Sequence, residues 1–319
     1  MAGPPPVVAA VRHHVRAALA DLEPHDLVLV AASGGADSTA LAAAVAFEAP
    51  RHGVRAGLLT VDHAWSAGSD QRAADVAELG RALGLEPSQV VSAPAPRSEG
   101  QARDRRREAL LAARDRLGAV ALLLGHTLDD QAETVLLRLA RGSGSRTLAG
   151  MAAREGSLRR PLLGLRRSET REFCRVSGLL VWDDPANDDP AFLRSRVRSE
   201  LLPVLTEVLG PGAVPALARS ADLLRDDADA LDAAADRVLD APDPSDVTVL
   251  SGLDRAVRTR VLRRCALRAG CPATDLAAGH VAELDALVTR WHGQGPLSLP
   301  GGVSARRRSG RIEFVRIDL

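Results

Sequence analysis

Residues Asp26–Ser38 have the sequence DLVLVAASGGADS. The apolar run Asp26–Ala32 predicts a buried strand, and a helical pattern follows over Thr39–Phe47. Two adjacent glycines between them let the backbone approach an anion closely, and the N–H groups at a helix start can surround phosphate oxygens. A simple connection with a serine or aspartate helix cap is the alternative. The pattern favours a phosphate-binding turn formed by Ser33, Gly34, Gly35, Ala36, Asp37 and Ser38.

The same alternation continues through the first half of the chain. Further strands are expected at Val54–Val61, Gln89–Ser92 and Ala119–Leu124, and helices at about 70–83, 101–117 and 129–140. Short apolar runs alternating with longer helices predict an α/β fold, a Rossmann-like doubly wound parallel sheet. Ligands of such sheets bind at the carboxyl ends of the strands, and the polar motifs follow the first, second and fourth strands.

The remainder of the chain differs in character. Helical patterns extend over 192–209, 253–269 and 276–291, and Leu297–Ile317 predicts a β-hairpin. The aspartate-rich stretch Asp222–Asp246 is interpreted as a solvated helix face. We therefore expect two domains, residues 1–210 and a smaller, mainly helical domain of residues 211–319 that ends in the hairpin.

Composition excludes several classes of protein. The chain has 319 residues with 41 basic and 41 acidic side chains, and every fixed basic charge is an arginine because the sequence contains no lysine. Walker A loops, Schiff-base enzymes and pyridoxal-phosphate enzymes need lysine and are excluded. Three cysteines without a C-x-x-C pair argue against zinc fingers, iron–sulfur sites and disulfide frameworks. Without a signal-peptide pattern or a membrane-length apolar run, we expect a cytoplasmic protein with no membrane contact.

A second motif follows the fourth predicted strand. Residues 125–134 read GHTLDDQAET and place His126, Asp129, Asp130 and Glu133 near a helix start. Residues three or four apart share one helix face. Acidic residues there suit the helix dipole, so helix capping is the simpler interpretation. Next to a phosphate-binding turn, paired carboxylates favour Mg²⁺ binding and the handling of an amine.

Both motifs resemble those of a known family. Residues 33–38 resemble the S-G-G-x-D-S loop of the PP-loop, or N-type ATP pyrophosphatase, superfamily. Residues 125–144 resemble the G-H-x-x-D-D-x-x-E-T…R-G motif of its tRNA(Ile)-lysidine synthetase (TilS) family. Supporting segments lie at 61–63, 99–106, 148–151, 160–163, 184–187 and 192–198. Arg107 stands where that family usually has Tyr, and Ser195 where it usually has Asn.

The resemblance implies a two-step reaction on a tRNA. ATP adenylates the wobble cytidine of the CAU anticodon of isoleucine tRNA at C2, through its O2 oxygen, and releases pyrophosphate. The ε-amine of free L-lysine then attacks C2, AMP leaves, and lysidine results. The expected cofactors are ATP and Mg²⁺, the expected partners are the tRNA and lysine, and a homodimer is left open. The C-terminal domain would bind tRNA.

The resemblance also assigns roles to residues. The catalytic candidates are Asp37, His126, Asp129, Asp130 and Glu133. ATP would contact residues 33–38 together with Asp62, His63 and Gly125, and Mg²⁺ would bind Asp37 and Asp130. Arginine side chains can pair with phosphates and stack on unpaired bases, so the candidate tRNA contacts are Arg103, Arg106, Arg194 and Arg198.

Three other functions share parts of this pattern. A PP-loop tRNA cytidine thiolase would need sulfur-carrying cysteines, whereas Cys174, Cys265 and Cys271 are spaced like ordinary buried residues. An amide- or amidine-forming ATP pyrophosphatase for small molecules would work without RNA. A non-catalytic nucleotide-binding module would bind ATP without releasing pyrophosphate.

Overall fold

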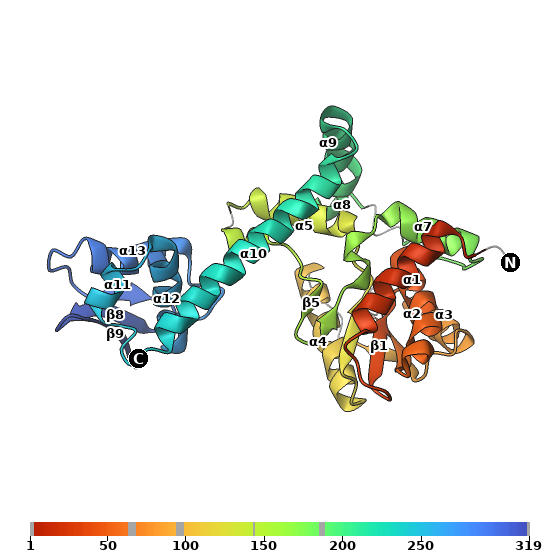
Figure 1. Ribbon diagram of the computed structural model, residues 1–319, viewed down its shortest axis with the longest axis horizontal. Helices are drawn as coiled ribbons and strands as arrows, with labels where there is room; N and C mark the ends of the chain where they lie inside the picture. The colour runs from red at the N-terminus through yellow and green to blue at the C-terminus, as the bar shows by residue number, and fades with distance from the viewer. Residues whose placement is uncertain (1–2, 63–67, 94–98, 143, 185–188, 318–319) are drawn as a thin grey trace. The chain divides into compact units, whose positions relative to one another are not determined.

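The computed structural model describes residues 3–62, 68–93, 99–142, 144–184 and 189–317 (Figure 1). Contacts divide the chain into two units, Met1–Asp222 and Leu223–Leu319. That division falls inside one continuous helix, α10 (Ala213–Leu239). The domain boundary at residue 210 stays a prediction.

The N-terminal unit is built on a six-stranded sheet with the order β3-β2-β1-β4-β6-β5. Neighbouring strands are parallel except β5 and β6, which form an antiparallel pair. The α/β prediction is therefore confirmed, with one short antiparallel edge that was not predicted. The strands are β1 (Leu27–Ala31), β2 (Arg55–Asp62), β3 (Ser88–Ser92), β4 (Ala121–Leu124), β5 (Arg154–Glu155) and β6 (Leu158–Arg159).

Helices cover both faces of this sheet. Alternate residues of β1 point to opposite sides: Val28 and Val30 belong to a core with α2 (Ala36–Glu48) and α3 (Ser69–Ala82), whereas Leu27 and Leu29 pack with Leu110 of α4 (Glu99–Arg116). The strand order explains why helices lie on both faces. Strands β2 and β3 are added on one side of β1, and the chain then crosses back to form β4 on the other side of β1. Right-handed crossovers place the helices before and after that reversal on opposite faces.

The reversal brings the carboxyl ends of β1 and β4 side by side, the position at which ligands of such sheets bind. Residues 32–35 leave β1 and enter α2, and residues 125–127 leave β4 and enter α5 (Leu128–Leu139). The two sequence motifs therefore meet at this edge.

Further helices complete the N-terminal unit. Helix α1 (Pro6–Leu19), which was not predicted, buries Val8, Val11, Val15 and Leu19 against α2 and α7 (Figure 1). The remaining elements are η1 (Ala49–His52), α6 (Ser145–Leu148), η2 (Pro161–Gly164), α7 (Arg167–Val176), α8 (Leu193–Arg196), the π-helical turn η4 (Val197–Leu201) and α9 (Leu202–Leu209). Among the described residues no single helix could span a membrane, although the bent pair 193–209 and 213–239 passes that test together.

The C-terminal unit packs the second half of α10, the helices α11, α12 and α13, and a small sheet around its own core. Strand β8 lies between β7 and β9 in antiparallel pairing, so the predicted hairpin is a three-stranded sheet. The acidic face of α10 is not wholly solvated, because Asp232 and Asp236 pair with Arg260 and Arg264. The elements are α11 (Val247–Ser251), α12 (Arg255–Arg268), α13 (Ala278–Thr289), β7 (Leu297–Leu299), β8 (Val303–Arg308) and β9 (Arg311–Arg316).

Candidate active site

The glycine turn after β1 is held in shape by its own side chains. Gly34 has a φ of +85°, a conformation that non-glycine residues rarely adopt, and Gly35 caps α2. The Ser38 hydroxyl donates to the Gly35 carbonyl oxygen at 3.0 Å and accepts from the Ser33 N–H at 3.1 Å. Ser38 therefore closes the turn, and the first N–H groups of α2 have no partner within the helix.

Gly125 allows the end of β4 to lie against that turn. A Cβ at this position would lie 3.0 Å from the Ser38 nitrogen and 3.1 Å from the Asp37 carbonyl oxygen. Both are backbone atoms, so a side chain at position 125 would force the two motifs apart. The glycine is required here by close approach.

Thr127 and Asp130 fix the start of α5 by a reciprocal cap. The Thr127 N–H and hydroxyl both donate to Asp130 Oδ2, at 2.8 and 2.9 Å. The helix-capping interpretation is correct for this residue. However, only Oδ2 is used in this way, and Oδ1 accepts a bond of 2.8 Å from Arg167 Nη2.

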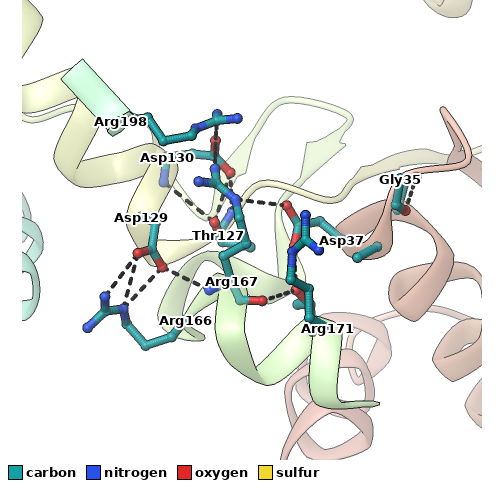
Figure 2. Close-up of polar contacts among 12 residues, drawn as sticks. Gly35, Asp37, Thr127, Asp129, Asp130, Arg166, Arg167, Arg171 and Arg198 are labelled. Carbon is teal, nitrogen blue, oxygen red and sulfur yellow. Dashed lines mark hydrogen bonds and ion pairs between the residues drawn. The ribbon is translucent and has the colours of Figure 1, made fainter. Parts of the chain in front are cut away.

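Asp130 and its neighbours form a dense cluster of opposite charges, which we call the carboxylate–arginine cluster (Figure 2). Glu133 is fully buried and is bonded by three guanidinium groups, with shortest distances of 3.3 Å to Arg167, 2.7 Å to Arg194 and 2.8 Å to Arg198. A buried carboxylate is stable only with such partners. The members are Asp37, Asp129, Asp130, Glu133, Arg166, Arg167, Arg194 and Arg198.

The two adjacent aspartates of the motif have different partners. Asp129 accepts from the backbone N–H of Arg167 at 2.8 Å and from the Arg166 guanidinium at 3.0 Å, so it caps α7 from outside (Figure 2). Asp130 instead faces the arginines shared with Glu133. The same residue type at neighbouring positions thus serves two helices.

The surroundings of Asp37 and Asp130 shift their pKa values in opposite directions. Burial raises the pKa of the Asp37 carboxyl, and the charge of Asp130 raises it further, against the opposing effects of the Thr170 hydroxyl and Arg167. Burial also raises the pKa of Asp130, but Arg167 and Arg194 outweigh it, and the pKa lies below its usual range. Asp130 therefore stays charged, whereas the charge of Asp37 is costly.

This donor set suits Mg²⁺ that is bound together with phosphates. Two carboxylates, Asp37 of the phosphate-binding turn and Asp130 of α5, lie close enough for their charges to repel, and both contact Arg167. Mg²⁺ commonly takes one or two carboxylates and completes its shell with phosphate oxygens and water. Within the described residues no group of three or more His, Cys, Asp or Glu side chains is placed to hold a metal ion. The cation would therefore depend on the phosphates of ATP.

The other candidate residues are not members of this cluster. His126 is half-buried, and its charge acts on Asp130. Asp62, at the end of β2, accepts a bond of 2.7 Å from the Ser69 hydroxyl. Arg106 lies near enough to Asp184 for their charges to interact. His63 and the side chain of Arg103 lie outside the described residues.

Sequence reasoning missed the contribution of α7. Arg166 and Arg167 contact Asp129 and Asp130, which lie 37 positions earlier in the chain. Thr170 contacts Asp37, which lies 133 positions earlier. One signal was available: two arginines begin a helix, where the helix dipole disfavours positive charge. Such a placement indicates acidic partners elsewhere in the fold.

Cys174 does not have the properties of a sulfur carrier. Burial raises the pKa of its thiol to about 11, and its Sγ contacts the Ala36 carbonyl oxygen at 3.4 Å. Reactive cysteines have lowered pKa values and partial exposure. Burial raises the pKa of the other two thiols as well, Cys265 and Cys271.

Comparisons with known proteins agree with this geometry. Residues 8–205 match the family model of the PP-loop domain, and residues 246–313 match the TilS substrate binding domain. The fold resembles that of the U34-tRNA thiolase NcsA from Methanococcus maripaludis, with a TM-score of 0.57, 17% identity, and coverage of 69% of this chain and 80% of that chain. The fold and the site thus define a PP-loop ATP-binding protein.

Curated relatives narrow this class further. A tRNA(Ile)-lysidine synthase from Thermobifida fusca is 56% identical over 98% of each chain. One from Streptomyces coelicolor is 51% identical over 97% of this chain and 98% of its own. The chain belongs to the tRNA(Ile)-lysidine synthase family.

Proposed function

We propose that this chain is an ATP-dependent ligase that forms lysidine in isoleucine tRNA. One observation carries the proposal: the phosphate-binding turn and the acids of the second motif meet at one sheet edge, through the close approach of Gly125 to Asp37 and Ser38. Membership of the family supports the assignment of the substrate. ATP, a tRNA with a CAU anticodon and free L-lysine are the proposed substrates.

The first step uses the turn after β1. The unpaired N–H groups at the start of α2 would bind the phosphates of ATP, helped by the helix dipole. The O2 oxygen of the wobble cytidine attacks the α-phosphorus and forms a P–O bond, and the bond to pyrophosphate breaks. Asp37 and Asp130 would hold Mg²⁺, which supplies positive charge to the transferring and leaving phosphates.

The second step requires an amine without its proton. The lysine ε-ammonium must lose a proton before its nitrogen attacks C2 and AMP leaves. Because the pKa of Asp130 is lowered, its carboxylate is suited to orient the ammonium, and His126, beside it, is suited to take the proton. Glu133 and Asp129 are proposed to keep this arrangement in place through their arginine partners.

Binding of the RNA would involve both units. Arg103 and Arg106 of α4, together with Arg194 and Arg198, are proposed to contact the anticodon region. To do so, Arg194 and Arg198 would have to give up their ion pairs with Glu133 and pair with RNA phosphates instead. The C-terminal unit carries the match to a substrate binding domain, and we propose that it contacts the tRNA elsewhere. A homodimer stays a prediction, which light scattering tests.

A labelling experiment tests the function. Purified protein, radiolabelled lysine and ATP are incubated with isoleucine tRNA or with the same tRNA carrying uridine at the wobble position. Label should enter only the cytidine-containing RNA, only with ATP, and with one pyrophosphate released per lysine. Release of AMP and pyrophosphate with a small acceptor and no RNA would instead indicate a small-molecule synthetase. Pyrophosphate without lysine incorporation would overturn the proposal.

A further inference from the structure

Arg167 joins the acids of two different helices. Its Nε lies 3.4 Å from Oδ2 of Asp37 in α2, and its Nη2 lies 2.8 Å from Oδ1 of Asp130 in α5. Its Nη1 lies 3.3 Å from Oε1 of Glu133, one turn further along α5. Figure 2 shows this guanidinium between the two motifs. Each nitrogen of the planar group thus has a carboxylate within ion-pair distance.

The position of Arg167 in its own helix is locally unfavourable. It is the first residue of α7, where the partial positive charge of the helix repels a cation, and its side chain is only 19% exposed. The acidic partners compensate for both costs. The backbone N–H of the same residue is bound by Asp129, so main chain and side chain are both fixed by the second motif. An arginine anchored at both ends has little freedom to move.

The chemistry of the guanidinium matters here. Arginine presents five N–H donors in a rigid plane, whereas lysine presents a single compact charge. Only the planar group can contact acids that lie in three directions. Arg194 and Arg198 contact only the α5 side of the cluster, Asp130 and Glu133, and neither contacts Asp37. Among the described contacts of the cluster, Arg167 is the link between α2 and α5.

We propose that Arg167 is a positioning residue that holds Asp130 and Glu133 in register with the phosphate-binding turn, so that the amine is presented to the adenylated base. This inference rests on the proposed function. It places the larger effect in the transfer step, where Asp130 is the proposed partner of the ammonium, because in adenylation Mg²⁺ would itself hold Asp37 and Asp130 together. A displacement of about 1 Å in such a constellation can cost about 10²-fold in rate.

Single-turnover kinetics separate the two steps. Adenylation is measured as pyrophosphate release from ATP and tRNA without lysine, and transfer is measured by adding labelled lysine to the preformed intermediate. In Arg167→Gln we expect the transfer rate to fall about 10²-fold and adenylation to fall less than about 10-fold. Arg167→Lys should recover part of the transfer rate, because the charge returns without the planar contacts.

The control is Arg175→Gln on the same helix. Arg175 is exposed, and within the described part of the chain its ion-pair partner is Glu172, one turn away on α7. Its variant should keep both rates. Thermal melting of every variant shows whether the fold survives. A purely structural role of Arg167 would lower both rates together with the melting temperature, and that result would overturn the proposal.

A double-mutant cycle keeps the test decisive if Arg167→Gln is unstable. The cycle compares the wild type with Glu133→Gln, with Arg167→Lys, and with the double variant that carries both changes. If the two residues act as one unit, the double variant should lose much less transfer rate than the product of the single losses. Independent losses, or equal effects of Lys and Gln at position 167, contradict the inference. A wild type that incorporates no lysine refutes the proposed function instead.

Discussion

The backbone N–H of Trp182 donates a hydrogen bond of 2.9 Å to the carbonyl oxygen of Gly34. The segment after α7 thus supports the left-handed glycine of the phosphate-binding turn. The Arg72 guanidinium of α3 lies over the Trp182 ring at 4.8 Å. A residue far along the chain therefore helps to shape the site where ATP is proposed to bind.

Removal of the Trp182 ring should weaken ATP binding. The backbone bond and the Cβ next to Gly34 survive in Trp182→Ala, but the ring no longer packs against Arg72, so the segment that supports the turn becomes less ordered. We expect the KM for ATP to rise about 3- to 10-fold, which corresponds to about 0.7–1.4 kcal/mol. Trp182→Phe should lose less. Trp291→Ala, a matched change in the C-terminal unit, should leave this KM unchanged, and an equal rise there would contradict the prediction.

A single methyl group at position 125 should be harmful. In Gly125→Ala the new Cβ would meet backbone atoms of Asp37 and Ser38, which cannot move without shifting α2. Overpacking of this kind costs about 1–3 kcal/mol. We expect a lower melting temperature and a KM for ATP raised about 10-fold or more. Gly279→Ala, which has open space, should be neutral or slightly stabilising, and unaltered ATP binding in Gly125→Ala would refute the steric account.

Asp37 should cost stability in the absence of ligand. Because its pKa is raised, the folded protein holds the charged form unfavourably at neutral pH and gains stability as pH falls through that pKa. Asp37→Asn should therefore melt at a higher temperature at pH 7.5, and its advantage should shrink on acidification. Each kcal/mol corresponds to a shift of about 2–4 °C.

The same variant should lose activity, because Asp37 is a proposed Mg²⁺ ligand. We expect pyrophosphate release to fall by about two orders of magnitude. The exposed residue Asp75 provides the control, and Asp75→Asn should change neither property. A lower melting temperature of Asp37→Asn at pH 7.5 would show that its hydrogen bonds outweigh its burial.

Salt dependence tests the proposed RNA contacts of Arg194 and Arg198. Both guanidinium groups bond Glu133 in the ligand-free protein, so a phosphate must compete with that carboxylate. If they contact phosphates, each Gln variant should bind tRNA more weakly, with a slope of log affinity against log salt that is smaller by about 0.7–0.9. Unchanged slopes with a slower transfer step would assign both arginines to Glu133 alone.

Replacement of all three cysteines should preserve activity. The variant Cys174→Ala, Cys265→Ala, Cys271→Ala should incorporate lysine within about 3-fold of the wild type, because no step needs a thiol. Its melting temperature should fall, since Cys174 and Cys271 are buried. Loss of activity without loss of stability would favour a thiolase.

Local sequence patterns predicted most of the sheet and the meeting of the two motifs. Short apolar runs such as Asp26–Ala32 identify strands from a few adjacent residues, and their alternation with helices indicates parallel pairing. The order of the strands comes from the structure. Helix α1 has a recognisable helical spacing of apolar residues at Val8, Val11, Val15 and Leu19, but the prolines that precede it obscured the pattern. The partners of Arg167 could not be predicted from the sequence, because an ion pair between residues 130 and 167 produces no pattern among neighbouring residues.

The division of work between Asp129 and Asp130 has a consequence for genetics. Loss of either carboxylate should reduce the modification of the anticodon in the cell. The structural reason differs between the two residues. A substitution of Asp129 removes the cap of α7, so a second substitution that stabilises this helix should restore function. A substitution of Asp130 removes a charge from the site itself, and no distant substitution can replace that charge. A suppressor screen should therefore yield second-site suppressors for substitutions of Asp129 and none for substitutions of Asp130.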